Sequence, residues 1–388
     1  MTFSTLALVL VLGLAGPLLA WRSAWHVPVI VGELLTGILF GTTGFGVLDA
    51  SDSLFSFLAD MGFALVMFVA GTHVPVRDPR VRSALGTGVV RAVLVGMCAA
   101  VAGYLLAGWF GTDHGAVYTV LIGSSSAALV LPIIDSQGLQ GKSVLELTAQ
   151  VAIADTASIV ALPLVIDLGN AGRAALGALA VAAAALAGFV VLRWLERSGV
   201  RRRAHRVSED RKFALELRVS LAMVFALAAI ATRAHVSIML AGFAAGLAVA
   251  GIGEPRRLAR QLFAVTEGFL GPLFFVWLGA RLNLREFADR PQFILLGVAL
   301  GLCAVAVHVL MRILGQPIGL GVLAAAQIGV PVAAVTVGTQ LHVLVPGEAA
   351  AMVLGALVTI MAAVGASVFE GRRARPRGST AGHGTAAG

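Results

Sequence analysis

The amino-acid sequence predicts an all-α protein that crosses a membrane about thirteen times. Hydrophobic residues make up 59% of the 388 residues and charged residues only 12%, and the mean hydropathy is +0.94. Soluble domains contain about 45–50% apolar and about 25% charged residues. Apolar runs long enough to cross a ~30 Å hydrocarbon core recur along the chain with short connections between them. Their centres lie near residues 11, 37, 64, 96, 126, 156, 183, 222, 244, 271, 302, 330 and 357.

The spans predict one transmembrane domain over residues 1–370 and a disordered cytoplasmic tail over 371–388, which is rich in Gly, Ala and Arg. Any chemistry must therefore take place inside the membrane. The two cysteines, Cys98 and Cys303, both fall within predicted spans, so no disulfide or Cys metal framework is expected. The sequence contains no nucleophile triad, metal cluster or phosphate loop. We expect neither an enzyme nor a bound cofactor.

The positive charges predict the orientation, because Lys and Arg accumulate in short cytoplasmic loops. The loops after even-numbered spans are mixed or acidic, which places the N-terminus outside and the C-terminus in the cytoplasm. Anionic lipid at the bilayer surface accounts for the net charge of +8 better than nucleic acid does, so we expect no nucleic-acid partner. The basic loops follow odd-numbered spans, at residues 21–26, 77–82, 196–212, 254–260 and 372–377.

The chain contains a weak internal repeat at an offset of 206 to 209 residues. That offset corresponds to seven spans, and an odd number of crossings inverts the second copy relative to the first. We therefore expect two inverted repeats, at about 1–168 and 212–370, joined by the seventh span and a basic loop. The matching positions are His26 and His235, Gly37 and Gly246, Gly71 and Gly279, Arg77 and Arg285, and Gly123 and Gly329.

Two spans at matching positions of these repeats carry signs of interruption. The fifth reads "IGSSSAALVLP", with Gly123 and Pro132, and the twelfth reads "AQIGVPVAAV", with Gly329 and Pro331. Helices broken inside a membrane expose backbone groups, which is tolerated only where those groups are buried or line a cavity. We expect two discontinuous helices that cross near the midplane, where half-helix dipoles and free carbonyls can bind ions.

Asp155 is a single carboxylate near the centre of the sixth span, with no Lys, Arg or His in the same span. It lies about 15 Å from either membrane surface at ~1.5 Å per residue. An ionised group there costs at least ~2.5–3.5 kcal/mol, so an intramembrane acid is a functional candidate by default. The competing interpretation is a structural hydrogen bond to a Ser or Thr of a neighbouring helix.

The physical chemistry of Asp155 suggests competition between a proton and a monovalent cation. Desolvation favours the protonated acid, whereas a bound cation stabilises the ionised form. If only the neutralised carboxylate can pass between inward- and outward-facing states, obligatory exchange follows. Oxygen ligands suited to Na⁺ or K⁺ could come from Thr156, Ser158, Ser124, Ser125 and Ser126.

At this point the chain resembles the monovalent cation:proton antiporters of the second family, which includes bacterial Na⁺/H⁺ exchangers and K⁺ efflux proteins. The resemblance covers residues 5–370. It rests on three stretches, "VPVIVGELLTGILFG" with Glu33, "LADMGFALVMFVAG" with Asp60 and Gly71, and "PLFFVWLGARLNL" with Gly279.

The resemblance implies the sodium/proton antiporter fold, with a dimerisation domain, a moving core domain and crossed helices. It places Asp155 on the essential ion-binding aspartate of the family. The implied partners are Na⁺ or K⁺, H⁺, the lipid bilayer and a second copy of the chain. The implied location is the bacterial inner membrane.

The chain departs from the family pattern at several positions. Ala154 precedes Asp155 where many members have a second ligand, and Val330 replaces an acid in "AQIGVP". Electrogenic members carry a buried Lys near the site, whereas the two lysines here, Lys142 and Lys212, fall in loops. These departures favour a single carboxylate and electroneutral one-for-one exchange.

Three further acids, Glu33, Asp60 and Glu267, sit off-centre in their spans. Roles in gating or ion access compete with ordinary helix–helix hydrogen bonding.

Two alternatives to antiport also stay open, namely an organic-anion carrier of related fold and a divergent membrane protein that does not transport. The unpaired Asp155 speaks against both.

Overall fold

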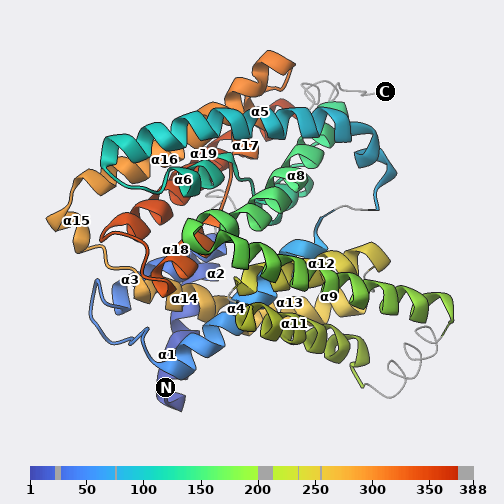
Figure 1. The fold of residues 1–388 in the computed structure, drawn as a ribbon, viewed down its shortest axis with the longest axis horizontal. Helices are drawn as coiled ribbons and strands as arrows, with labels where there is room; N and C mark the ends of the chain where they lie inside the picture. Colours follow the sequence, from blue (N-terminus) through green and yellow to red (C-terminus); the bar gives the residue numbers. More distant parts are fainter. Residues whose placement is uncertain (22–27, 75–76, 200–212, 235, 254–255, 375–388) are drawn as a thin grey trace, which may run out of the picture.

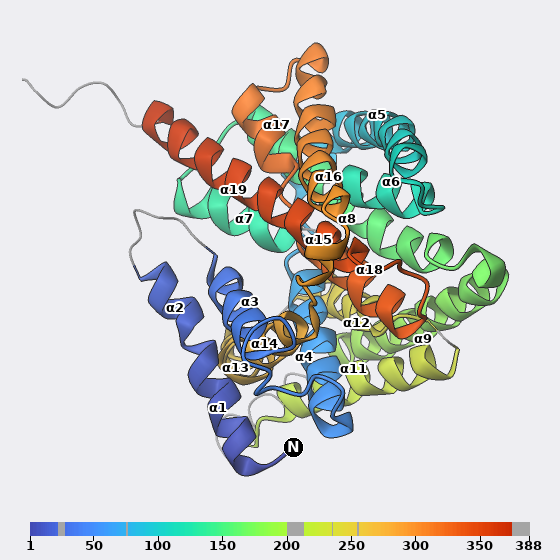
Figure 2. The same ribbon diagram turned by 90° about the vertical axis from the view of Figure 1, so that its left-hand side faces the viewer.

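The computed structural model describes residues 1–388 except 22–27, 75–76, 200–212, 235, 254–255 and 375–388. Every regular element in the described residues is helical, which confirms the predicted all-α class. The helices form two bundles that lie side by side (Figures 1 and 2). We name them the scaffold bundle and the site bundle.

The scaffold bundle takes helices from both ends of the first half of the chain and from the start of the second half. Helix α14 packs on α3 and α4, while α12 packs on α4, α9 and α11. The members are α1 (Phe3–Gly13), α2 (Ala15–Ala20), α3 (Val29–Phe40), α4 (Ser53–Thr72), α9 (Ala171–Arg197), α11 (Leu215–Arg233), α12 (Ile238–Ile252), α13 (Arg256–Val265), the π-helical turn η3 (Thr266–Leu270) and α14 (Gly271–Arg281).

The site bundle takes the middle of each half of the chain. Helix α5 packs along α6 and α8, and α16 packs along α19. The short 3₁₀ helix η2 (Leu168–Asn170) and helix α15 (Glu286–Asp289) lie in the connections to the scaffold bundle. The members are α5 (Pro79–Phe110), α6 (Gly115–Gly123), α7 (Ala127–Ser136), α8 (Lys142–Val165), α16 (Gln292–Val309), η4 (Leu310–Leu314), α17 (Ile318–Ala324), α18 (Gly329–Gln340) and α19 (Glu348–Ala374).

Within the described residues, eleven helical segments are long and apolar enough to cross a membrane. Two shorter apolar helices, α3 and α12, lie where the second and ninth spans are expected. Helices α6 and α7 together form one of the eleven, and so do α17 and α18. The number of thirteen crossings stays a prediction.

The scaffold bundle is held together by glycines that bring helix backbones into contact. A Cβ on Gly37 would lie 2.2 Å from the carbonyl oxygen of Val276, and one on Gly279 would lie 2.2 Å from that of Leu34. The same reciprocal arrangement joins α4 to α12, where Gly71 faces the Phe243 carbonyl. Small residues of this kind are how membrane helices approach closely, because lipid supplies no hydrophobic force between them.

Loops after even-numbered predicted spans meet at one end of the molecule. The Thr42 hydroxyl donates to the Ala280 carbonyl at 3.1 Å, which joins the loop after α3 to the end of α14. In the site bundle, His114 lies 2.7 Å from the Glu348 carboxylate through Nδ1, and the Tyr118 hydroxyl donates to the same oxygen at 2.6 Å. Glu348 is fully buried, and these contacts fix the start of α6 to the start of α19.

Most of the predicted basic loop at 196–212 and of the predicted tail at 371–388 lies outside the described residues, although α19 continues to Ala374.

A buried ion pair marks the other end of the site bundle. Arg91 on α5 donates to Glu146 on α8 at 2.9 Å, and the Arg91 side chain is only 2% exposed. This pair holds α5 against the helix that carries Asp155.

The first prediction concerns the glycine contacts. Replacing Gly246 by Ala places a methyl group 2.2 Å from the Phe68 carbonyl, where only backbone could move to accommodate it. We expect a loss of about 1–3 kcal/mol or more in stability, measured as thermal unfolding of the detergent-solubilised protein. Gly108→Ala on α5 is the matched control, because nothing lies within 4 Å of its Cβ position. Equal melting temperatures for the two variants would contradict this assignment.

The second prediction concerns the pH dependence of the His114 contact. The hydrogen bond from the His114 ring to the Glu348 carboxylate raises the pKa of His114 above its ordinary value of 6.5. A group whose pKa is raised in the folded state stabilises the protein fully below 6.5 and loses that contribution as pH rises through the raised pKa.

The melting temperature of the wild type should therefore exceed that of His114→Gln at about pH 5.5 by an amount worth roughly 1–2 kcal/mol. The difference should shrink by about pH 9. A difference that stays constant over this range would show that the imidazole charge contributes nothing.

Candidate functional site

The fifth span is interrupted at three serines. Helix α6 ends at Gly123, and α7 begins at Ala127. At the end of α6 the hydroxyl and the backbone amide of Ser124 both donate hydrogen bonds to the Leu121 carbonyl. Short hydroxyl side chains compete with the helical backbone for hydrogen bonds, which favours a break at consecutive serines. The unwound segment 124–126 is almost completely buried.

The twelfth span is interrupted at the matching place. Helix α17 ends at Ala324, the chain passes through the unwound residues 325–328, and α18 begins at Gly329. The two unwound segments bind each other, since the Ser126 amide donates to the Ala326 carbonyl at 2.8 Å and the Ser125 hydroxyl donates to the Ala324 carbonyl at 2.5 Å. Each break thus satisfies backbone groups of the other.

Asp155 lies on α8 at the start of α7. Its Oδ2 accepts a hydrogen bond from the Ala127 amide at 3.0 Å, and the residue is 4% exposed. The first four amides of a helix have no helical partner, and Ser126 provides no side-chain cap, so Asp155 caps α7 from another helix. The dipole at a helix N-terminus also favours a negative charge. Among the ion pairs in the described part of the chain, none includes Asp155.

The other predicted ligands are arranged unevenly around Asp155. Ser124, Ser125 and Ser126 all lie in the unwound segment that precedes Ala127, and Ser158 is buried on α8 three residues after Asp155. The Thr156 hydroxyl instead donates to the Ala152 carbonyl of its own helix at 2.8 Å. Serine oxygens that donate one hydrogen bond keep lone pairs with which they can bind a cation.

Two buried side chains at the crossing were not among the predicted site residues. Gln327, in the second unwound segment, accepts a hydrogen bond from the Ser124 hydroxyl. His308 on α16 is fully buried, with Nδ1 2.8 Å from the Ala304 carbonyl and Nε2 3.4 Å from the Ser125 hydroxyl. Gln327 lies in the stretch "AQIGVP", whose glycine and proline predict an interrupted helix. His308 lies near the end of an apolar run, where no sequence pattern indicates a place at the site.

Glu33, Asp60 and Glu267 lie on α3, α4 and η3, all in the scaffold bundle and not at the crossing. Glu33 is buried and interacts electrostatically with Glu267, whereas Asp60 interacts with Arg281. Asp60 also lines a cavity of about 500 Å³ between α4, α11 and α12. Their roles in gating or access stay predictions.

A helical membrane bundle in which two interrupted helices bind each other beside a buried carboxylate has the architecture of secondary transporters. The family model described as "Sodium/hydrogen exchanger, transmembrane" matches residues 6–370, and the chain belongs to this family.

Similar proteins carry related descriptions. The Bacillus subtilis protein YjbQ, described as a candidate Na⁺/H⁺ antiporter, is 24% identical over 380 residues, covering 92% of this chain. The Na⁺/H⁺ antiporter NhaS5 of Synechocystis is 30% identical over 274 residues, covering 67% of this chain. The chain spans 61% of the length of YjbQ and 37% of that of NhaS5.

The fold is similar to a solved structure, the sodium proton antiporter MjNhaP1 from Methanocaldococcus jannaschii at pH 8. The TM-score is 0.63, with 16% sequence identity and 96% of each chain covered. This likeness supports the fold alone.

The third prediction tests the bond between the two unwound segments. Gln327→Leu removes one of the two acceptors of the buried Ser124 hydroxyl and leaves the Leu121 carbonyl in place, so we expect a loss of about 0.5–1.5 kcal/mol in stability. In a double-mutant cycle with Ser124→Ala, the two losses should be less than additive by about 0.5–1.5 kcal/mol, measured by thermal unfolding in detergent. Strict additivity would mean that the two side chains do not interact.

Proposed function

We propose that the chain is a secondary antiporter that exchanges Na⁺ or K⁺ for H⁺, with Asp155 as the binding site for both. The observation that carries this proposal is the position of the Asp155 carboxylate. It is buried, lies at the N-terminus of an interrupted helix, and accepts one hydrogen bond from the Ala127 amide. Family membership and the descriptions of the relatives support Na⁺/H⁺ exchange.

The cost of an isolated buried charge explains why exchange is obligatory. A carboxylate without a counter-charge is unstable in a low-dielectric interior, so it is occupied by a proton or a cation whenever the site is closed to water. The helix dipole and the Ala127 amide stabilise the ionised form. The proton is therefore not held so tightly that a cation cannot replace it.

One carboxylate also implies one-for-one exchange. A single site that holds either H⁺ or one monovalent cation carries the same net charge in both crossings, so transport is electroneutral. The serine oxygens of residues 124–126 and of Ser158 complete the coordination of the cation, since hard oxygen ligands suit Na⁺ and K⁺.

The architecture of this transporter follows the predicted inverted repeat. Under that repeat Gly37 corresponds to Gly246 and Gly71 to Gly279, so the contact of α3 with α14 corresponds to that of α12 with α4. The reciprocal glycine contacts in both pairs support this correspondence. We propose that the site bundle moves against the scaffold bundle, that a second copy packs on the scaffold bundle, and that the N-terminus lies outside a bacterial inner membrane.

The fourth prediction tests Asp155 directly. In inside-out vesicles, addition of Na⁺, K⁺ or Li⁺ in turn should release protons from the wild type, without a response to an imposed membrane potential. Asp155→Asn should reduce this proton movement to the level of empty vesicles. The neutral amide side chain takes up no proton, and it has no negative charge with which to bind the cation. Asparagine still offers an oxygen to the Ala127 amide, so the variant should fold and insert normally.

Asp135→Asn is the matched control, since Asp135 is an exposed carboxylate near the C-terminal end of α7, the helix whose N-terminus Asp155 caps. It should transport at the wild-type rate. Absence of movement with any cation, from wild-type protein that is correctly inserted, would overturn the proposal and favour an organic substrate or a protein that does not transport.

A further inference from the structure

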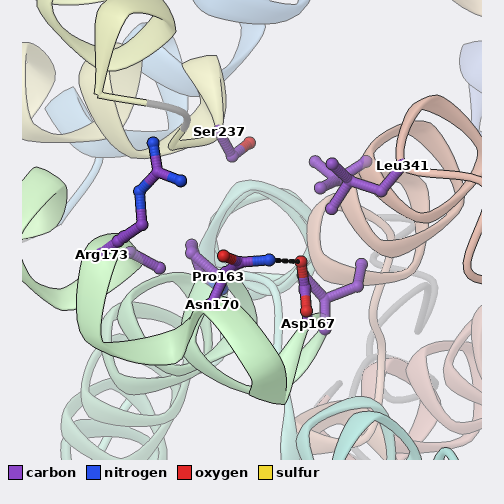
Figure 3. Close-up of a pocket in the computed structure, with 9 residues that line it drawn as sticks. Pro163, Asp167, Asn170, Arg173, Ser237 and Leu341 are labelled. Carbon is purple, nitrogen blue, oxygen red and sulfur yellow. Dashed lines mark hydrogen bonds between the residues drawn. The ribbon is translucent and has the colours of Figure 1, made fainter.

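A cavity of about 200 Å³ lies where the two bundles face each other (Figure 3). The ends of α8 and α18 line it from the site bundle, and the starts of α9 and α12 line it from the scaffold bundle. Its polar lining consists of Asp167, Asn170, Arg173 and Ser237, and Pro163 and Ile166 form part of the apolar wall.

The cavity lies along the same face of α8 as Asp155. Asp155, Ile159, Leu162 and Ile166 follow one another at helical spacing, and all four are buried. Ile166 is about 16 Å from Asp155 along the helix axis at ~1.5 Å per residue. Ile159 and Leu162, each 1% exposed, fill the interval, so the cavity is closed off from the carboxylate.

Pro163 interrupts the hydrogen bonding of α8 within this interval. Proline has no amide hydrogen, so the carbonyl of Ile159 cannot receive its usual helical bond from residue 163. The Ile159 carbonyl oxygen, one helical turn from Asp155, therefore lacks this helical hydrogen bond. The interval between the cavity and the site holds an oxygen of the kind that binds alkali cations.

Oxygen atoms also gather in the cavity. Oδ2 of Asp167 accepts a hydrogen bond from the side-chain Nδ2 of Asn170 at 2.8 Å, and the two side chains lie together in Figure 3. The Arg173 guanidinium extends toward the Ser237 side in the same view. No ion pair within the described ranges involves Asp167 or Arg173, so the charge of Asp167 is not cancelled by a direct contact.

Asp167 also lies at the boundary between the two bundles. The three residues of η2, Leu168–Asn170, connect α8 of the site bundle to α9 of the scaffold bundle. Short 3₁₀ turns commonly serve as connectors between helices. Movement of one bundle against the other therefore changes the cavity in which Asp167 lies.

We propose that this cavity is an access vestibule for the transported cation and that Asp167 recruits a hydrated monovalent cation there before it reaches Asp155. This inference rests on the proposed antiport function. Asp167 raises the local concentration of cations at the mouth, and Arg173, which lines the same cavity from the start of α9, opposes it. Asp167 binds no dehydrated ion, so it affects the apparent affinity and not the maximal rate.

The fifth prediction follows from this role. Asp167→Asn should raise the apparent KM for Na⁺ about fivefold, the effect of one unit charge at ~4 Å in a water-filled mouth. The maximal rate should be unchanged. Because the interaction is screened, the increase should diminish at high ionic strength. Proton movement against Na⁺ concentration is measured in both right-side-out and inside-out vesicles, and the KM should rise in only one of the two orientations.

Three variants make the outcome decisive. Asp167→Glu should retain the wild-type KM, and Arg173→Gln should lower it. Asp289→Asn, which removes an exposed carboxylate at the end of α15, should have no effect. The proposal is overturned if Asp167→Asn leaves the KM unchanged, lowers the rate at saturating Na⁺, or matches Asp289→Asn. Failure of the antiport function itself would appear separately, as wild-type vesicles without Na⁺-dependent proton movement.

Discussion

The architecture depends on how two interrupted helices satisfy their backbone hydrogen bonds inside an apolar environment. An unpaired amide or carbonyl costs several kcal/mol in a bilayer, so a break is tolerated only where partners are supplied. The Ser126 amide donates a hydrogen bond to the Ala326 carbonyl, and the Ala127 amide donates one to the Asp155 carboxylate. The same requirement that keeps the breaks buried therefore places a carboxylate at their meeting point.

The helices of the two bundles are held together by different kinds of contact. The scaffold bundle brings backbones together through Gly37, Gly71, Gly246 and Gly279, which leaves little freedom for its helices to shift. The site bundle contains most of the buried polar groups, including the Arg91–Glu146 pair and the Glu348 cluster at its two ends, while Glu33, Ser220 and Thr266 are buried in the scaffold bundle.

Much of this arrangement could be predicted from the sequence because the relevant signals are local. The serines at 124–126, the glycines and prolines of the twelfth span, and the isolation of Asp155 all stand out against an apolar background. The faces that helices present to one another are not local. A helix that is apolar all round gives no periodic signal, so neither the contact of His308 with Ser125 nor the pairing of Ser124 with Gln327 was evident.

The orientation of single side chains was also beyond the sequence. Thr156 stands beside Asp155 in the chain, yet its hydroxyl bonds back to Ala152, because β-branched threonine in a helix readily reaches the carbonyl four residues earlier. Asp167 falls in a connection that reads as an ordinary polar turn. Its place beside a cavity depends on α12 and α18, which are distant in sequence.

The glycine contacts of the scaffold bundle have a thermodynamic consequence. Helices that meet backbone to backbone in lipid are joined by dispersion forces and weak Cα–H···O contacts, and little apolar surface is withdrawn from water. Cores formed by the withdrawal of such surface lose cohesion on cooling, because that driving force weakens at low temperature. The cohesion of α3 with α14 and of α4 with α12 has no such dependence, so this half of the molecule keeps its rigidity in the cold.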